Sequence, residues 1–436
     1  MKMKAFFLVF LSAILPAAFV VPARAEVLTM PEGLRLAAES NRTIKITRQQ
    51  EGISEADTLI AKSPLLPTVN AYASQTFLAH QPKDVFGSLI VPTSNENFAS
   101  YSLDIQQLLY DFEGAASKYK ASKAILDTKR IDTQRVKNLT SLDFALAYFN
   151  LLESDKLVLV AEKEVDSVQS HLRDARNLFE EGVITKNDLL QAEVRLSDAQ
   201  QKLLTARNAR AINASRLNTI LSRPLSTEVE VKDVDETPAG RVVLDREKAW
   251  DAALGQRPEM RIVYETMKSL DLEETSRKAE YYPRFFADAS YDYTQNKFMV
   301  HQGNASFMFG MTLNLFSGGR TKAELLRIDH QKAQLQEQKS RLEDEIRLEV
   351  ESNILDVKNA SDRIKATKDS VGQAEENLRI NRVRYEEGVG TATEVLDAVT
   401  LLTVAETNYY RSVYDLRRAE SALLYSMGKD LADVYK

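Results

Sequence analysis

The sequence predicts a mainly α-helical chain with a transmembrane β part, organised as two structural repeats. Three observations predict this fold class. Residues 115–181 and 320–387 together hold one glycine and no proline. Motifs of the first half return in the second half at a fixed distance, and four stretches alternate apolar with polar residues. With only 15 glycines and 11 prolines in 436 residues, the turns of a large all-β protein are scarce.

The N-terminus has the composition of a secretory signal peptide. Lys2 and Lys4 precede an apolar run, and Ala23-Arg24-Ala25 supplies the small-x-small pattern of a cleavage site. We expect residues 1–25 to be removed. An uncleaved membrane anchor is the alternative, but the apolar run is short for a spanning helix. Cleavage removes three basic residues and no acidic one, which changes the formal net charge from −6 to −9.

Composition excludes several classes of protein and site. The acidic charge argues against a nucleic-acid partner. The absence of cysteine excludes disulfides, a thiolate nucleophile and the acylated cysteine of a lipoprotein, so we expect no lipid anchor. The four histidines are scattered, and no phosphate-binding loop is present. The sequence therefore predicts no enzyme, no cofactor and no metal site.

An internal repeat organises the chain. The segment Phe179-Glu180-Glu181-Gly182-Val183-Ile184-Thr185 returns as Tyr385-Glu386-Glu387-Gly388-Val389-Gly390-Thr391. Upstream the spacing grows by ten residues, since Pro67 corresponds to Pro283, so one connection within residues 78–97 is longer in the first half. We expect a first repeat at 26–225, a linker at 226–244 and a second repeat at 245–436.

Each repeat is predicted to contain a helix, two strands, a long helix, a turn and a last helix. In the first repeat we expect a helix at 31–63, strands at about 68–79 and 98–110, a long helix at 114–181, a tip turn at 182–187 and a helix to 222. In the second we expect a helix from 245, strands at about 284–296 and 305–316, a long helix at 320–387, a tip turn at 388–393 and a helix to 427.

The long helices are predicted to form coiled coils. At about 1.5 Å per residue, each would be a rod of roughly 100 Å, too long for a compact domain. Residues 31–63 and 185–222 together are about as long as one rod, so two short helices can lie end to end beside it. Val395, Leu402 and Tyr409 recur every seven residues, with alanine or serine between them, as close helix packing requires.

The four strands predict a sheet with one apolar and one polar face. Residues 285–293 place Phe, Ala and Tyr on one face, opposite Asp288 and Asp292. Strands of about ten residues with this alternation are typical of a wall between lipid and a polar lumen, although a soluble sheet with one buried face remains the alternative. Four strands cannot close a barrel with a lumen, so several chains would have to contribute strands.

At this point the chain resembles the TolC family of outer-membrane efflux proteins. The resemblance covers the mature sequence and is most specific at Tyr385-Glu386-Glu387-Gly388-Val389, at Glu394-Val395-Leu396-Asp397-Ala398, and at Gly182 followed by Asp188. It implies a homotrimer whose 12-stranded β-barrel in the Gram-negative outer membrane continues as a 12-helix α-barrel tunnel through the periplasm. It also implies a periplasmic adaptor protein and an inner-membrane transporter of the RND or ABC type as partners.

The resemblance also implies a gate at the periplasmic entrance. An aspartate near the first tip bonds a tyrosine and an arginine near the second in this family, and Asp188 and Tyr385 match the first two. Gly390 stands where the arginine would be, so we expect the entrance to close differently here, with Lys186 as one possible substitute. Glu394 and Asp397 match the acidic pair that rings the entrance. An ordinary solvated helix surface is the alternative for this pair.

Two further groups complete the predicted sites. Gly182, Val183, Gly388 and Val389 match the adaptor-contacting tips, while the glycines also serve as turn residues. Asp104, Asp288 and Asp292 are expected to face the lumen of the barrel.

The function predicted from these features is a passive, gated exit duct of a tripartite efflux pump or a type I secretion system. The alternative is a soluble periplasmic coiled-coil scaffold or adaptor. The sequence does not identify the cargo.

Overall fold

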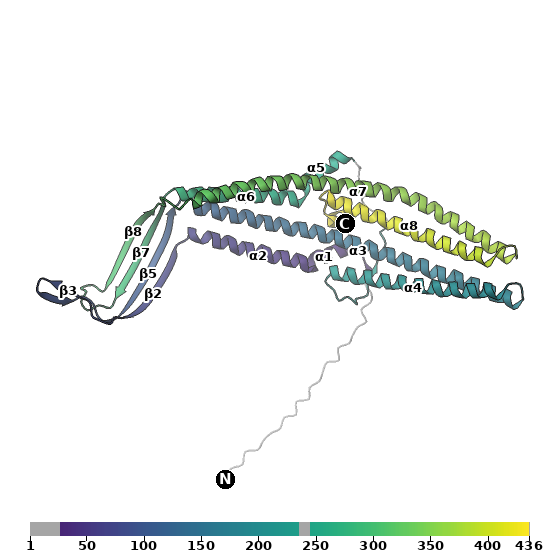
Figure 1. Ribbon diagram of the computed structural model, residues 1–436, viewed down its shortest axis with the longest axis horizontal. Coiled ribbons are helices and arrows are strands. Elements are labelled where there is room, and N and C mark those ends of the chain that lie inside the picture. Colours follow the sequence, from purple (N-terminus) through teal and green to yellow (C-terminus); the bar gives the residue numbers. More distant parts are fainter. Residues whose placement is uncertain (1–26, 235–244, 436) are drawn as a thin grey trace, which may run out of the picture.

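The computed structural model describes residues 27–234 and 245–435. The predicted signal peptide, residues 1–25, lies outside the described residues, as does the second part of the predicted linker. The molecule is elongated, with a sheet at one end and two helical turns at the other (Figure 1). In the described part of the chain, none of the helices is both long and apolar enough to cross a membrane.

The helices of the two halves correspond one to one and have equal lengths. They are α1 (Met30–Ser40) and α5 (Arg246–Gln256) with 11 residues, α2 (Arg42–Lys62) and α6 (Pro258–Lys278) with 21, α3 (Gly114–Glu180) and α7 (Arg320–Glu386) with 67, and α4 (Lys186–Ile220) and α8 (Ala392–Ser426) with 35. A short α9 (Leu431–Val434) ends the described chain, and 3₁₀ turns follow α2 and α6. Helices α2 and α4 lie along α3, α6 packs on both α3 and α7, and α8 lies along α7 and also packs on α3 (Figure 1).

The helix expected at 31–63 is interrupted at Asn41. Its backbone is non-helical (φ −57°, ψ 130°), because its side chain caps the next helix: Asn41 Oδ1 accepts hydrogen bonds from Thr43 N at 2.8 Å and Ile44 N at 3.4 Å. Arg257 interrupts the second half in the same way, since Pro258 disfavours a helical conformation in the residue before it. The break between two helices therefore occurs at the same place in both repeats.

Four antiparallel strands form one sheet in the order β2-β5-β7-β8. Their bounds are β2 Thr68–Phe77, β5 Asn97–Tyr110, β7 Arg284–Thr294 and β8 Gly303–Thr312. The central pair β5–β7 joins the two halves of the chain, and β2 and β8 are left as edges. The loop between β2 and β5 is not structureless, since it holds a hairpin of β3 (Lys83–Phe86) and β4 (Leu89–Pro92).

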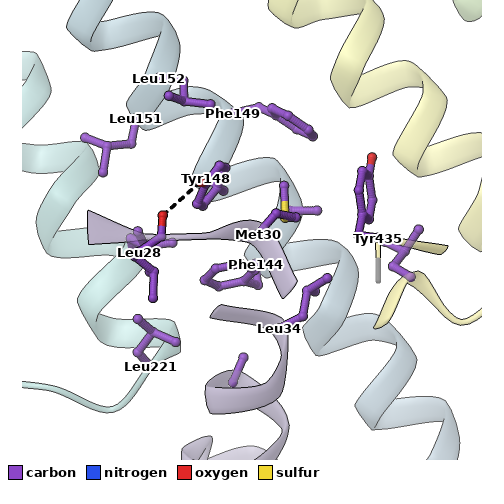
Figure 2. Packing of buried hydrophobic residues seen from close by; sticks show 14 of the residues in the cluster. Leu28, Met30, Leu34, Phe144, Tyr148, Phe149, Leu151, Leu152, Leu221 and Tyr435 are labelled. Carbon is purple, nitrogen blue, oxygen red and sulfur yellow. Dashed lines mark hydrogen bonds between the residues drawn. The ribbon is translucent and has the colours of Figure 1, made fainter. Parts of the chain in front are cut away.

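The largest apolar core lies midway along the helices, around α3. Phe144, Tyr148 and Phe149 of α3 are fully buried there among residues of α1, α4 and α8 (Figure 2). The ring of Phe144 packs directly over Gly33, where a Cβ atom would lie 2.0 Å from the ring. Only glycine allows this approach.

Part of the predicted linker 226–244 is ordered and packed. Residues Glu230–Val231 form β6, which pairs in parallel with β1 (Val27–Leu28) beside this core. The hydroxyl of Tyr148 lies 2.9 Å from the carbonyl oxygen of Leu28 in β1 (Figure 2) and 2.6 Å from that of Lys232, the residue after β6. A buried tyrosine hydroxyl needs a hydrogen-bond partner, and these two backbone carbonyl groups supply it.

Candidate functional site

The turns α3–α4 and α7–α8 lie at the same end of the molecule, opposite the sheet (Figure 1). Both end their long helix in the same way. Gly182 and Gly388 adopt positive φ values of 80° and 73°. In the first turn Val183 N donates to Leu178 O at 2.8 Å, and in the second Val389 N donates to Arg384 O at 2.9 Å. This is the Schellman geometry, which glycine adopts without a Cβ penalty.

Each tip exposes an apolar side chain at its apex. Val183 is 63% exposed and Val389 is 70% exposed, and among the described residues no atom beyond the chain neighbours lies within 4 Å of the Cβ position at Gly182 or Gly388. The predicted tip residues are therefore free for contact with another protein.

Two residues predicted at the entrance start helices. The carboxylate of Asp188 accepts hydrogen bonds from Thr185 N at 3.1 Å and Thr185 Oγ1 at 2.8 Å, and Glu394 accepts from Thr391 N at 2.9 Å. In return, each threonine hydroxyl accepts from the backbone N–H of its acidic partner. These are capping boxes at the starts of α4 and α8.

Within the protomer Asp188 and Tyr385 are not hydrogen bonded. The carboxylate of Asp188 is held by Thr185, and the hydroxyl of Tyr385, a residue only 6% exposed, has no partner among the described residues. Burial raises the pKa of Tyr385, and the negative charges of Asp188 and Asp174 add to the rise. The ring of Tyr385 packs against His171 of α3, with 5.0 Å between the ring centroids.

A side chain at Gly390 would be in tight contact with the end of α7. A Cβ atom there would lie 3.0 Å from Tyr385 N and 3.2 Å from Arg384 Cβ. The guanidinium at this tip comes from Arg384, which lies 3.7 Å from the Glu394 carboxylate and 3.5 Å from the carbonyl oxygen of Val389. Lys186, the substitute considered from the sequence, makes no ion pair with the described residues.

The acidic pair predicted at the entrance has basic neighbours. Arg384 pairs with Glu394, and Arg195 of α4 lies 3.6 Å from Asp397 of α8. All four side chains are more than 40% exposed, and exposed pairs contribute little to stability. The second pair links the hairpin α3–α4 to the hairpin α7–α8.

The register of the sheet places Asp104, Asp288 and Asp292 on one face. Asp104 is opposite Ser290, and Asp292 is opposite Ser102. Cross-strand partners share a face, so the other face carries the alternating apolar residues, such as Ile105 beside Ala289. Throughout residues 27–234 and 245–435, the acidic and histidine side chains form no group suited to a metal ion.

Sequence reasoning missed three residues of the tip region: His171, Arg195 and Arg384. Each contacts a residue on another helix, and helical periodicity carries no signal for such a pairing. The capping roles were readable, because Thr185 precedes Asp188 by three residues and Thr391 precedes Glu394 by three.

Comparison with known proteins gives consistent matches. A family model described as "Outer membrane efflux protein" matches residues 33–223 and 250–429. Outer membrane efflux protein BepC of Brucella suis biovar 1 (strain 1330) is 21% identical over 413 residues, which are 93% of this chain and 86% of that protein. Alkaline protease secretion protein AprF of Pseudomonas aeruginosa is 24% identical over 353 residues, which are 77% of this chain and 71% of that protein.

The fold is shared with a solved structure. The outer membrane protein VceC of Vibrio cholerae superposes with a TM-score of 0.78 at 16% identity, covering 92% of this chain and 96% of that one.

Proposed function

Because the chain belongs to the outer membrane efflux protein family, we propose that it is the exit duct of a tripartite efflux pump or a type I secretion system. In this proposal it passively conducts cargo from a periplasm-spanning complex to the exterior and is gated at its periplasmic end. Members of this family are channels, and passive conduction through a duct requires no catalytic residues in this chain. The names of BepC and AprF refer to efflux and to protease secretion, so both kinds of system remain open for this chain.

The observation that carries the proposal is a four-stranded sheet with two free edges at one end of long helical rods. Free strand edges in lipid would leave backbone groups without hydrogen-bond partners, at a cost of several kcal/mol each. Three copies would pair every edge and give a closed barrel of twelve strands. Its apolar face would meet lipid, and the face with Asp104, Asp288 and Asp292 would line the lumen.

The helices would extend this barrel as a tunnel. Each protomer has four helices side by side, α3 and α7 with either α2 and α6 or α4 and α8, so three protomers would give twelve helices in cross-section. The tips would reach far into the periplasm. Val183 and Val389, exposed beside their turn glycines, would meet the periplasmic adaptor protein. An inner-membrane transporter of the RND or ABC type would supply the energy.

We propose the Gram-negative outer membrane as the location, reached by a cleaved signal peptide and without a lipid anchor. The alternative, a soluble periplasmic scaffold, is less favoured because a soluble protein would have to cover the apolar face of the sheet. Fractionation of cells that express the full chain separates the two. We expect the protein in the outer-membrane fraction, released by detergent and not by high salt. Recovery in the soluble periplasm would contradict the duct.

The entrance carboxylates give a prediction on ion selectivity. Glu394→Gln with Asp397→Asn removes two negative charges per protomer, while glutamine preserves the capping-box position. A charged channel mouth can enrich counter-ions about tenfold. We therefore expect the cation preference of the reconstituted channel to fall severalfold. The measurement is the reversal potential in a salt gradient.

The matched control for this experiment is Asp344→Asn with Glu345→Gln. These carboxylates are exposed on α7, away from the tips, and each is also paired with an arginine. The control should keep the cation preference. An unchanged preference in the entrance variant would contradict the acidic entrance.

A further inference from the structure

Two unpartnered polar groups are buried side by side near the tips. His171 of α3 is 4% exposed, and its Nε2 atom has no hydrogen-bond partner within residues 27–234 and 245–435. Tyr385 of α7 is 6% exposed, and its hydroxyl also has none. Their rings are in contact, with centroids 5.0 Å apart and planes inclined by 51°. Buried polar groups are nearly always paired, so two adjacent exceptions call for an explanation.

This contact joins the two helical hairpins at their tip ends. Tyr385 lies in an apolar cluster with Val395 and Val399 of α8, and Val168 of α3 belongs to the same cluster. One turn further along α3, Leu172 and Ala175 pack on α4. His171 therefore lies where the hairpin α3–α4 holds the hairpin α7–α8. Any outward movement of α7–α8 must separate the two rings and let water reach them.

The charged groups around the pair come from three helices. Burial lowers the pKa of His171. The negative charge of Asp174 on α3 raises this pKa, and the positive charge of Arg382 on α7 lowers it further. On the α4 side the nearby charge is Asp188, whose carboxylate is already bonded to Thr185. Helix α8 presents the apolar Val395 and Val399. Asp174 is exposed to solvent, and its attraction for a positive charge on His171 is smaller than the effect of burial, to which the guanidinium of Arg382 adds.

We propose that His171 is a gating residue, which in its neutral form holds the hairpin α7–α8 against α3–α4 and on protonation releases it. The inference rests on the proposed gated duct and adds to it a group that senses acid. Protonation creates a buried imidazolium whose Nε2 atom has no hydrogen-bond partner among the described residues, which destabilises the closed arrangement. Opening relieves this by hydrating both His171 and Tyr385.

The direction of the pH effect follows from linkage. The closed form binds the His171 proton less tightly than the open form, in which a hydrated histidine titrates near pH 6.5. The stability of the closed form is therefore complete above about pH 6.5 and is lost as the pH falls below it. Acid opens the entrance.

The test is the conductance of the purified full-length protein in planar lipid bilayers between about pH 7.5 and about pH 5.5. For the wild type we expect a low conductance at the higher pH that rises severalfold at the lower. His171→Phe keeps a planar ring in the site and removes the titrating group, and His171→Gln is a second neutral variant. Both should stay at the low conductance throughout the pH range.

The matched control is His330→Gln, which changes an exposed histidine on α7. It should show the wild-type pH profile. A severalfold rise that persists in both His171 variants, or a wild type whose conductance does not change with pH, would overturn the role of His171 and leave the duct intact. A wild type without conductance at any pH would overturn the duct and, with it, the gate.

Discussion

Replacing Gly388 by glutamate is expected to abolish export while folded trimers remain in the outer membrane. Gly388 has φ +73° at the apex of the α7–α8 turn, and no atom of the described residues other than its chain neighbours lies within 4 Å of its Cβ position. A side chain there costs roughly 1–2 kcal/mol of backbone strain, which long helices and a closed sheet can absorb. The bulky charge would, however, lie beside Val389 on the surface proposed to meet the adaptor.

The measurement compares export by the cells with the amount of trimer in their outer membrane. Gly372→Glu is the matched control, since Gly372 lies inside α7, also has nothing within 4 Å of its Cβ position, and does not need a positive φ. The control should export normally. Normal export by the Gly388 variant would exclude the tips as the adaptor contact.

Truncation of Phe144 to alanine is expected to cause the largest loss of stability. Phe144 is fully buried at the middle of α3, where it packs over Gly33 and beside Tyr148. Removing a buried phenylalanine side chain costs about 3–5 kcal/mol, because the cavity that it leaves is only partly refilled. The core holds β1 and β6 through Tyr148, so these strands should loosen first. Thermal unfolding in detergent, followed by circular dichroism, should show a clearly lower midpoint.

Phe179→Ala provides the comparison on the same helix. Phe179 is 37% exposed near the tip end of α3, so its truncation removes less buried surface. Its midpoint should stay much closer to that of the wild type. Equal shifts in the two variants would show that the Phe144 core does not dominate the stability of the helical part.

The long helices and the faces of the sheet could be predicted because their signals are local. Gly182 and Gly388 end segments without helix breakers, and the alternation around Asp288 assigns its face without knowledge of the partner strand. The family resemblance carried by the tip motifs is confirmed by the family model, which matches most of both repeats.

Other features depend on contacts between distant segments. β6 lies in a stretch that reads as linker, and it is ordered because it pairs with β1 under Tyr148. The interruption at Asn41 had a readable signal, a capping residue, within the stretch expected as one helix at 31–63. The hairpin of β3 and β4 has a Gly87-Ser88 turn, but it lies in a stretch expected only as a longer connection.

The tip region was the hardest part to predict. The resemblance drew attention to Asp188 and Tyr385 as partners, but in the protomer Asp188 caps α4 and Tyr385 packs on His171. Periodicity along one helix gives no information on which side chain of another helix fills the space beside it. Arg384 likewise supplies a charge near Gly390 from a position that the motif does not mark.

The most direct test of the duct is the conductance of the purified, detergent-extracted protein in a planar lipid bilayer. We expect discrete, uniform current steps from trimers, which appear at about pH 5.5 if the entrance is closed at neutral pH. Trimers that insert and give no current steps at any pH, or a protein that stays in solution without detergent, would contradict it.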